Sequence, residues 1–385
     1  MRKTKILTAI FTVLTAVSLC GCANVDGEDS TAHSDEIHQQ SSENDIGSDG
    51  KPSTTIEENK TFPTKCKIYK QKRKQFSEEQ LLSFFRGTTQ KGDNYVGGTI
   101  HYENDVEVGY ITDGMFRYST LAGIKYGSIC NSSFFEDNNI EGYADGTLDF
   151  ASRDETYENV SAVLREEFGI AQEEFFAEKF YAVKKENVDL YKELFFEEAN
   201  KPETSSNELE LAKLKEQAEK LRKIPSEDYY YISFDFKIDD IPLYPGWGFY
   251  FGTAESDMIM GYIADIVYTK NGIESIYLVN VNETDVSSAE EVDIISSDEA
   301  KALMRQKFDG IIMDGEIETY DMQFVYLPIP QNDLGDYFTN FEAKPFYAFY
   351  WKKTESYNGE MITSNFISYF DAVTGAEFAV EPIEN

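Results

Sequence analysis

Residues 229–237 read Tyr-Tyr-Tyr-Ile-Ser-Phe-Asp-Phe-Lys. Aromatic and β-branched side chains dominate this run, and from Ile232 onward apolar and polar residues alternate, as in a strand with one buried face. Similar runs follow at 241–251, 258–268 and 273–281. Asn271-Gly272, between the last two runs, is a strong signal for a tight hairpin. The second half of the chain is therefore predicted to contain an antiparallel sheet.

The same half continues with one helix and further strands. Ser296 and Glu299 precede an apolar run in the spacing of a capping box, so a helix is expected over 295–304. Strands are expected at 317–327, 345–353, 362–371 and 377–380. Strands combined with a packed helix indicate an α+β arrangement.

The segment that precedes this half is helical in pattern. Apolar residues recur at helical spacing over 158–168, 173–196 and 207–223, and Pro225 follows the last of these runs. A loop containing Pro, Thr and Ser at 201–206 separates the last two, which predicts a helical hairpin.

A smaller segment comes before the helices. Ser77 and Gln80 form a second capping-box pattern, which predicts a helix over 76–85. Short strands are expected at 97–102, 106–112 and 115–120. The predicted fold class is α+β, with antiparallel sheets, packed helices and a helical middle segment.

The N-terminus has the pattern of an export signal. Arg2, Lys3 and Lys5 precede an apolar run over 6–19, which is too short for a comfortable membrane-spanning helix. Leu19-Cys20-Gly21-Cys22 then resembles the lipobox of bacterial lipoproteins. The resemblance implies cleavage before Cys22 and a diacylglycerol on its thiol, which would hold the chain on the outer face of a membrane. An ordinary secretory signal or a buried N-terminal helix is the alternative.

These patterns divide the chain into expected units. Residues 1–21 form the signal peptide, and residues 22–60 form a disordered acidic tether, because they contain almost no large apolar side chain. A small α+β domain is expected over 61–155, a helical segment over 156–225 and a sheet domain over 226–385.

Charge excludes one class of partner. The chain has 70 acidic and 35 basic residues, for a net charge of −35. Such a chain repels nucleic acid and anionic headgroups, so we expect no nucleic-acid binding. Solubility close to an anionic cell surface explains the charge, and a specific cationic partner is the alternative.

Catalytic signatures are absent from the sequence. Histidine occurs at His33, His38 and His101, and the last is expected on the solvent face of a strand. No nucleophile-elbow, phosphate-loop or zinc-protease motif occurs. The sequence therefore predicts no catalytic residue, no cofactor and no enzyme, although a glycoside hydrolase, which needs only two carboxylates, stays open.

One loop has part of the spacing of a calcium site. Acidic and amide residues from Asp137 onward follow the EF-hand pattern, but Leu148 stands where a bidentate Glu should close the loop. A plain acidic loop is the expectation, and no metal is predicted.

Two cysteines remain after processing at Cys22. Outside the cytoplasm Cys66 and Cys130 can form a disulfide, and the alternative is a pair of buried, inert thiols.

Aromatic residues are unusually dense in the sheet half. Clusters occur at 229–231, 244–251 and 346–351. In a strand, alternate members face opposite sides, so some can be exposed for a ligand or a partner. The candidates for such a surface are Tyr244, Trp247, Tyr250 and Trp351, and packing between sheet faces is the alternative.

The sheet half also resembles a known type of module. The run Ser296 to Glu299-Ala300, the late stretch 369–375 ending in Thr374-Gly375, and the turn at 238–244 resemble PepSY-type domains and the extracytoplasmic regulators YycH and YycI. Asp240 departs from this pattern, in which Gly is usual. The whole chain resembles large clostridial-type lipoproteins of unknown function.

The resemblance implies a PepSY-like domain and a non-enzymatic, membrane-tethered module that engages another cell-envelope protein and restrains or tunes it. The function expected from the sequence is thus a lipid-anchored extracytoplasmic protein of binding or regulatory type. A surface protein that binds glycans or peptides is the alternative, and an enzyme acting on the cell wall comes third.

Overall fold

The computed structural model describes residues 53–54, 62–92, 99–130, 134–201, 208–243, 249–250, 258–259, 262–309, 315–331, 339–357 and 360–378. For 53–54, 208–210, 249–250, 258–259, 357 and 360 the backbone alone is described. The fold is α+β, as the sequence predicts, and two mainly antiparallel sheets carry it.

The first sheet contains strands from both halves of the chain. Its order is β3 (Gln90–Lys91), β4 (Ile100–Glu103), β5 (Glu107–Thr112), β6 (Met115–Thr120), β13 (Gly272–Val279), β12 (Ile263–Thr269), β8 (Tyr229–Ile238) and β7 (Phe175–Val183), and β9 (Ile241–Pro242) pairs with β8. The hairpin predicted at Asn271-Gly272 is confirmed, since Thr269 pairs with Gly272. Strand β8 also forms as predicted and is central in this sheet.

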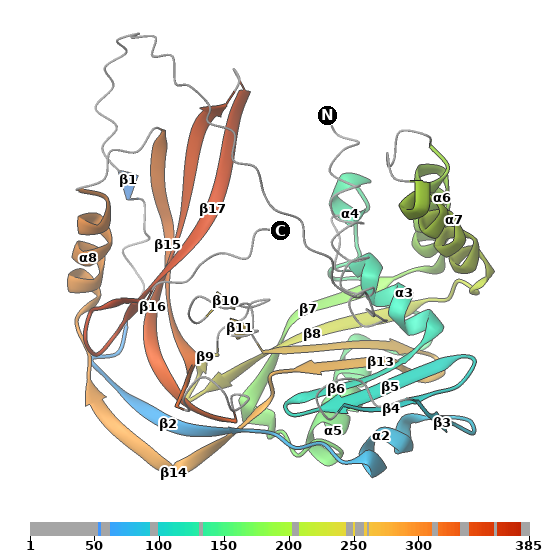
Figure 1. The fold of residues 1–385 in the computed structure, drawn as a ribbon, viewed down its shortest axis with the longest axis horizontal. Helices are drawn as coiled ribbons and strands as arrows, with labels where there is room; N and C mark the ends of the chain where they lie inside the picture. The colour runs from blue at the N-terminus through green and yellow to red at the C-terminus, as the bar shows by residue number, and fades with distance from the viewer. Residues whose placement is uncertain are drawn as a thin grey trace, which may run out of the picture.

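The second sheet stands upright on the left of Figure 1, beside the first sheet. Its path is β1 (Ser53–Thr54), β15 (Glu316–Pro330), β16 (Asn340–Tyr357), β17 (Glu360–Asp371) and β18 (Glu377–Phe378), and β2 (Lys65–Arg73) lies between β16 and β14 (Asn282–Asp293). A separate pair is formed by β10 (Phe249–Tyr250) and β11 (Met258–Ile259).

Strands β2 and β14 pair through opposite charges. Along β2 the lysines are exposed while Cys66, Tyr69 and Gln71 are buried. Lys65 lies 2.6 Å from Glu291 on β14, and Lys74 after β2 lies 2.9 Å from Glu283. Opposite charges on adjacent strands stabilise their pairing. Neither strand was predicted, because both lack a strong apolar alternation.

Helices cover both faces of the first sheet. On one face α2 (Glu78–Phe84) packs on β5 and β6, and α5 (Arg153–Glu166) packs on β12 and on Phe234 of β8. On the other face α3 (Leu121–Cys130), α4 (Phe134–Asp137) and α6 (Lys185–Ala199) pack on Tyr229 and Tyr231. The odd-numbered tyrosines of β8 therefore belong to the core on one face of the sheet, and its even-numbered residues from Ile232 onward belong to the core on the other face.

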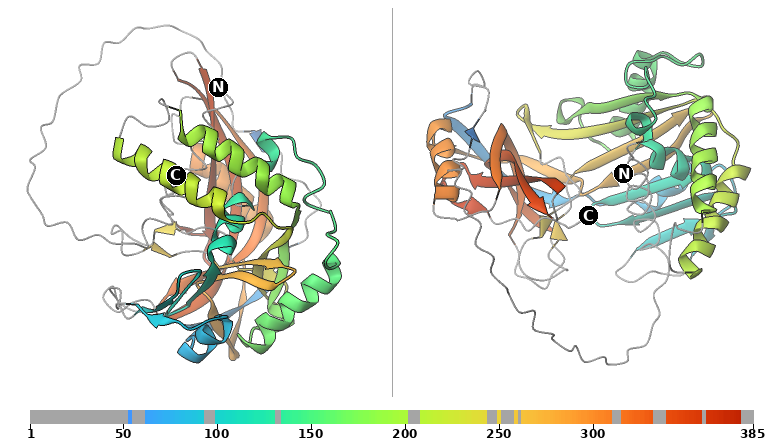
Figure 2. Two further views of the ribbon diagram at one scale, coloured as in Figure 1. Left: turned by 90° about the vertical axis from the view of Figure 1, so that its right-hand side faces the viewer. Right: turned by 90° about the horizontal axis from the view of Figure 1, so that it is seen from above.

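The helical hairpin predicted in the middle of the chain is confirmed. Helix α7 (Glu208–Lys223) packs on α6, and Leu214, Ala218 and Leu221 contact Phe195 and Ala199. Figure 2 shows this pair at one end of the molecule and α8 (Ser297–Asp309) at the other, on the second sheet. In α8 the predicted capping box forms, with Ser296 Oγ accepting from the Glu299 amide at 3.2 Å.

The helix predicted over 173–196 is wrong in its first half. A short 3-10 turn (Gln172–Glu174) leads into β7, and only the second half is helical, as α6. Strand β7 pairs with β8 from Phe175↔Phe236 to Val183↔Tyr229. Its neighbour in the sheet overrides the helical spacing of its sequence.

The domain boundaries predicted at 155/156 and 225/226 are wrong. Strand β6 pairs with β13, and β2 pairs with β14 and β16, so the first and last expected domains share both sheets. One core cluster extends from Phe116 in the first sheet to Tyr326 and Tyr347 in the second. Residues 226–385 therefore do not form a separate unit, and the PepSY resemblance stays a prediction.

The turn at the departure from the PepSY pattern is sterically demanding. Asp239 and Asp240 have φ of 49° and 63°, in the left-handed region, and they join β8 to β9 as a two-residue hairpin loop. Two positive φ values define the type I′ turn that suits a twisted hairpin, and Asp adopts them more readily than most residues. Glycine is therefore not required at position 240.

Part of the predicted tether is ordered. Ser53 and Thr54 form β1 and pair in parallel with Glu318 and Thr319. The rest of 22–60 and the signal over 1–21, with Cys22, lie outside the described residues. In the described part of the chain, no helix is both long and apolar enough to cross a membrane.

Candidate functional site

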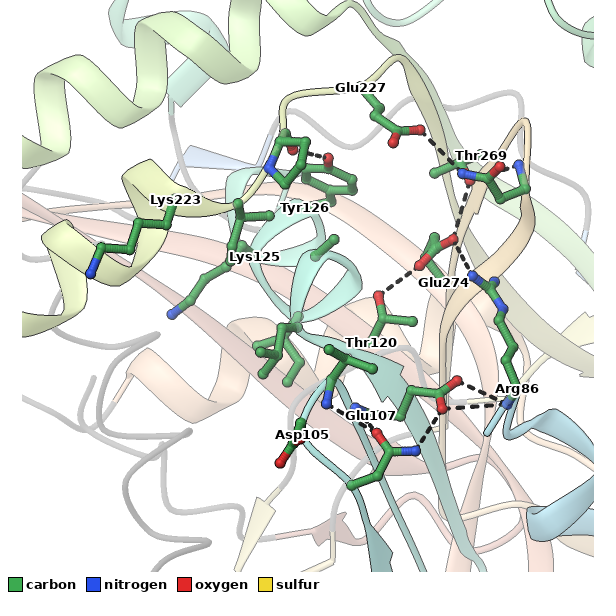
Figure 3. A pocket seen from close by; sticks show the side chains of 18 of the residues that line it. Arg86, Asp105, Glu107, Thr120, Lys125, Tyr126, Lys223, Glu227, Thr269 and Glu274 are labelled. Carbon is green, nitrogen blue, oxygen red and sulfur yellow. Dashed lines mark hydrogen bonds and ion pairs between the residues drawn. The ribbon is translucent and has the colours of Figure 1, made fainter. Parts of the chain in front are cut away.

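A cleft of about 1210 Å³ opens where several loops of the first sheet meet α3 and α7 (Figure 3). Its lining comes from the residues after α2, the β4–β5 turn, the β6–α3 junction, the β12–β13 hairpin, and α7 with the residues after it. Small-molecule sites usually measure ~300–1,000 Å³, so this cleft can hold a sizeable ligand.

One wall of the cleft is the start of α3. Thr120 ends β6, and its Oγ1 accepts a hydrogen bond from the Gly123 amide at 3.0 Å, which satisfies one of the first free amides of the helix. Leu121, Ile124 and Lys125 share a helix face by their spacing and line the cleft. This wall is apolar except for one cation.

The opposite wall is the outer face of α7. Gln217, Lys220 and Ile224 follow one another at helical spacing and line the cleft, whereas Leu214, Ala218 and Leu221 point to α6. Packing on α6 thus determines which face of α7 lines the cleft.

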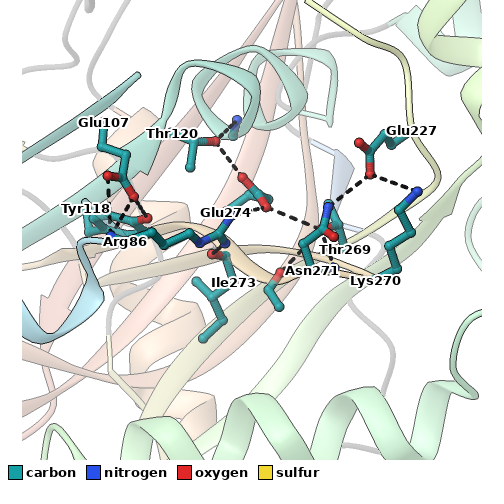
Figure 4. Close-up of polar contacts among 12 residues, drawn as sticks. Arg86, Glu107, Tyr118, Thr120, Glu227, Thr269, Lys270, Asn271, Ile273 and Glu274 are labelled. Atoms are coloured by element: carbon teal, nitrogen blue, oxygen red, sulfur yellow. Dashed lines mark hydrogen bonds and ion pairs between the residues drawn. The ribbon is translucent and has the colours of Figure 1, made fainter. Parts of the chain in front are cut away.

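Glu274 forms the centre of the cleft floor. Its carboxylate is 8% exposed and forms an ion pair with Arg86, whose Nη1 lies 2.9 Å from Oε1. Thr120 Oγ1 donates to Oε2 at 2.7 Å, and Thr269 Oγ1 donates to Oε1 at 3.4 Å. Figure 4 shows these contacts converging on Glu274 from different segments of the chain. The carboxylate is therefore held by a cation and two hydroxyl groups.

Glu107 is a second buried carboxylate beside the floor. It accepts hydrogen bonds from Tyr118 OH at 2.7 Å, from Asn104 Nδ2 at 2.8 Å and from the Arg86 amide at 3.1 Å. Burial opposes ionisation, but the hydrogen bonds from Asn104 and Tyr118 outweigh it and lower the pKa of Glu107. Burial, and then the bond to Glu107, raise the pKa of Tyr118. Glu107 is therefore a stable carboxylate.

Lys125 differs from the other charged groups of the cleft. Its side chain is partly buried, and it forms no ion pair with any of the described carboxylates. Burial, and then the positive charge of Lys220, lower its pKa. In Figure 3 the ammonium groups of Lys125 and Lys223 extend to the same side of the cleft. Positive charge is therefore concentrated on this side of an otherwise acidic protein.

Gln217 adds a polar group on the facing wall. Its Oε1 is buried and takes part in no hydrogen bond with the described residues. A buried amide normally finds partners, so this group is available to a ligand in the cleft.

The remaining charges at the cleft are compensated or lie at its rim. Lys220 lies 2.7 Å from Glu216, and both side chains are well exposed. Glu227 accepts from Asn271 Nδ2 at 3.3 Å and lies 3.8 Å from Lys270. Asp105 is exposed at the rim. Lys125 and Lys223 are consequently the cations of this cleft that form no ion pair with the described carboxylates, and of the two only Lys125 is partly buried.

The residues that the sequence singled out lie elsewhere. Tyr244 and Trp247 lie outside the described residues, and of Tyr250 only the backbone in β10 is described. Trp351 was predicted on a ligand or partner surface, and this is wrong for its side chain, which is 8% exposed. It stacks on Phe366 at 4.3 Å between ring centroids, and its Nε1 donates to Ser368 at 3.0 Å, under α8. For Trp351 the packing alternative holds.

The disulfide between Cys66 and Cys130 does not form. Both thiols are free and buried, as the alternative had it. Cys66 contacts Tyr326 OH at 3.0 Å in the core between the sheets, whereas Cys130, the last residue of α3, contacts Tyr229 OH at 3.5 Å. Burial raises the pKa of both thiols. They occupy different core clusters, so the fold keeps them apart.

His101 is another correction. It was expected on a solvent face, but it is 7% exposed. Gly92, at the end of β3, lies against its ring and covers it, so a Cβ there would clash with Nδ1.

The Asp137 loop is described, and no group of three His, Cys, Asp or Glu in the described structure could hold a metal ion.

The cleft itself was not found from the sequence. A usable signal exists in residues 121–130, Leu-Ala-Gly-Ile-Lys-Tyr-Gly-Ser-Ile-Cys, where Lys125 is the one charged residue in an apolar helix. A lone charge in such a segment indicates either a buried ion pair or a site.

Comparisons with known proteins inform the fold. No family model matches the sequence, and no curated protein matches it. The chain is similar in structure to an uncharacterized protein from Eubacterium rectale ATCC 33656, whose crystal structure was determined at 1.45 Å resolution. The TM-score is 0.54 at 15% sequence identity, over 86% of this chain and 90% of that one. The two chains therefore share a fold over most of their lengths.

Proposed function

We propose that this protein is a lipid-anchored extracytoplasmic binding protein that takes up a small ligand in the cleft between α3 and α7. The signal-like N-terminus and the Cys22 lipobox support the location. The cleft supports the binding role, because it combines a large concave apolar wall with a few convergent polar groups.

The observation that carries the proposal is that Lys125, which forms no ion pair with the described carboxylates, lines the same cleft as Gln217. Buried or partly buried polar groups without partners cost folding free energy, and proteins retain them mainly where a ligand uses them. The carboxylates of the floor favour binding over acid–base catalysis. Hydrogen bonds from Tyr118 and Asn104 favour the ionised form of Glu107, and Glu274 is engaged by Arg86 and Thr120, so both carboxylates serve to hold the floor together.

A ligand screen on a cleft-filling variant tests this function. The chain from residue 22 with Cys22→Ala keeps every described element. Its Tm is measured alone and in the presence of cell-wall fragments, glycans, peptides or lipids. Leu121 is 47% exposed at the cleft, so Leu121→Trp obstructs it. Leu190→Trp, at the 36% exposed Leu190 on α6, is the matched control.

The expected result is a compound that raises the Tm of the parent and of Leu190→Trp but not that of Leu121→Trp. A compound that stabilises all three chains equally binds elsewhere, and this outcome would remove the cleft from the proposal. The anchoring part is tested separately in cells, where Cys22→Ala should move the protein from the membrane fraction to the medium.

A protein partner is the second candidate, favoured by the free edge of the second sheet. Strand β17 pairs with β16 along its length but with β18 only at Tyr369 and Phe370, so no described strand pairs with its other edge over 360–368. Met361 is 67% exposed on this strand, and Ile362 and Ile367 are also exposed. Unpaired edges with apolar side chains are sites at which another chain can add a strand.

Crosslinking on intact cells tests this second role, with Cys22→Ala as the unanchored control. If a membrane or cell-wall protein docks on β17, Met361→Lys should abolish its capture, whereas Leu121→Trp should not. Equal capture by Met361→Lys and the parent would exclude this edge.

A further inference from the structure

We infer that the ligand of the cleft is an amphipathic anion: a small molecule with an apolar body that lies along α3 and a carboxylate or phosphate head that pairs with Lys125. This inference rests on the proposed binding function and specifies the chemistry of its ligand.

The first argument is the charge balance around Lys125. An ammonium group removed from water loses hydration energy, which a carboxylate partner normally offsets. Here the charge that acts on Lys125 is the cation Lys220 from α7, and Lys223 extends to the same side. With 70 acidic residues in the chain, a carboxylate partner at this point would be easy to supply. An anionic ligand supplies the missing charge.

The second argument is that the acids of the cleft are already engaged. Glu274 pairs with Arg86, Glu227 contacts Asn271 and Lys270, and Glu107 accepts from Tyr118 and Asn104. A cationic ligand would therefore find only the exposed Asp105 at the rim, where water screens the interaction. The electrostatics of the cleft favour an anion over a cation.

The third argument concerns Gln217. Its amide lies on the face of α7 that lines the cleft, and its oxygen is buried without a hydrogen bond to the described residues. Rotation about the last side-chain bond exchanges the oxygen and the NH₂ group, so the amide can donate to an oxyanion. Lys125 and Gln217 then offer a charge and a hydrogen-bond donor from opposite walls.

The fourth argument concerns the body of the ligand. Leu121, Ile124, Ile224 and Pro225 make the walls largely apolar. Tyr126 also lines the cleft but offers no open ring face, because it is 2% exposed, stacks on Tyr229 at 4.5 Å and donates its hydroxyl to Pro225 O at 2.8 Å. Sugar rings bind on open aromatic faces, so this cleft suits an alkyl or acyl chain better than a glycan.

The test uses probes that share one chain and differ in the head group. Decanoate, decyl phosphate, decanol and decylammonium are titrated calorimetrically, below their micelle concentrations, into the chain from residue 22 with Cys22→Ala. The variants are Lys125→Met, Gln217→Leu and the charge-matched control Lys215→Met, which removes an exposed lysine on α7.

Binding of decanoate or decyl phosphate, with decanol and decylammonium at least about tenfold weaker, is the expected result. Lys125→Met should weaken the anionic probes about tenfold and leave decanol unchanged, and Lys215→Met should change neither. Gln217→Leu should weaken the anions by a smaller factor. The comparison of decanoate with decyl phosphate decides between a carboxylate and a phosphate head.

Equal binding of all four head groups, or preference for decylammonium, would overturn the inference. So would an anion preference that Lys125→Met leaves intact. If no decyl probe binds while the ligand screen yields a cleft ligand blocked by Leu121→Trp, the ligand class is wrong and the binding function stands. If Leu121→Trp blocks nothing, the binding function itself fails.

Discussion

Arg86 and Glu274 form an ion pair across 188 residues of sequence, with Arg86 Nη1 2.9 Å from Glu274 Oε1. The same guanidinium donates from Nη2 to Ile273 O at 2.7 Å, and the Arg86 amide donates to Glu107. Arg86, which follows α2, thus links β5 to β13. Together with Thr120 it holds Glu274 in the floor of the cleft. The contact explains how the two halves of the chain build one site.

Arg86→Met should destabilise the protein. The substitution leaves the Glu274 carboxylate, which is 8% exposed, with hydroxyl partners only. Because Arg86 itself is 45% exposed, we expect a loss of about 1–3 kcal/mol in the free energy of unfolding, measured by urea denaturation. Lys65→Met, which breaks an exposed pair with Glu291, is the control and should lower the free energy of unfolding much less, because water screens this pair. Equal losses would contradict the structural role of Arg86.

Lys125 should react with amine reagents at lower pH than other lysines. Burial, and then the charge of Lys220, lower its pKa from an ordinary value of 10.5, so more of its free base is present near neutral pH. Limited acylation over a rising pH series, read by mass spectrometry, should label Lys125 before the exposed Lys215. Labelling in the opposite order would show that the cleft does not depress the pKa of Lys125.

Asp235 on β8 should give the protein a stability that falls as pH rises toward neutrality. Burial, and then Glu178 on β7, raise its pKa to about 7, with Asp265 on β12 adding to the rise and Lys179 opposing it. The folded state therefore holds the proton more tightly than the unfolded state. The stabilising contribution is fully present below about pH 4 and is lost as pH rises through about 7.

Asp235→Asn should remove this dependence. After discounting for the partial exposure of Asp235, we expect the variant to be more stable than the parent by about 1–2 kcal/mol above neutral pH, with the difference vanishing at acidic pH. Urea denaturation at several pH values measures the difference. A constant difference at every pH would assign the effect to packing and not to the carboxyl group.

Cys66 and Cys130 should both be inert in the folded protein. Burial raises the pKa of each thiol, and the reactive species is the thiolate. In the chain from residue 22 with Cys22→Ala they are the two remaining cysteines. Maleimide should add to neither until urea unfolds the chain, and then to both without any reductant. Labelling that needs a reductant would indicate a disulfide.

Local patterns in the sequence predict the elements whose signals lie among neighbouring residues. The alternation in β8, the capping boxes of α2 and α8, the Asn271-Gly272 hairpin and the α6–α7 pair all appear as expected. The α+β class follows from these elements. Such signals are reliable because strand alternation, helix capping and turn geometry depend on side chains a few positions apart.

Local patterns could not predict the features that depend on a partner far away in the sequence. Strand β7 has helical spacing, and it becomes a strand because β8 pairs with it. Basic β2 and acidic β14 lack an apolar pattern and pair through their charges. Trp351 and His101 were predicted to be exposed, but α8 covers Trp351 and Gly92 covers His101. Each outcome depends on which segment comes to lie against the residue.

The sequence by itself determined the elements with local signals, the fold class, the acidic surface and the expectation of export. Tertiary structure alone decided that the two halves share both sheets, that Cys66 and Cys130 stay apart, and that Arg86, Lys125, Gln217 and Glu274 line one cleft. The physical reason is that periodicity records only which face of an element is apolar. Which faces then meet depends on strand pairing and packing between segments far apart in the chain, and no local pattern encodes that choice.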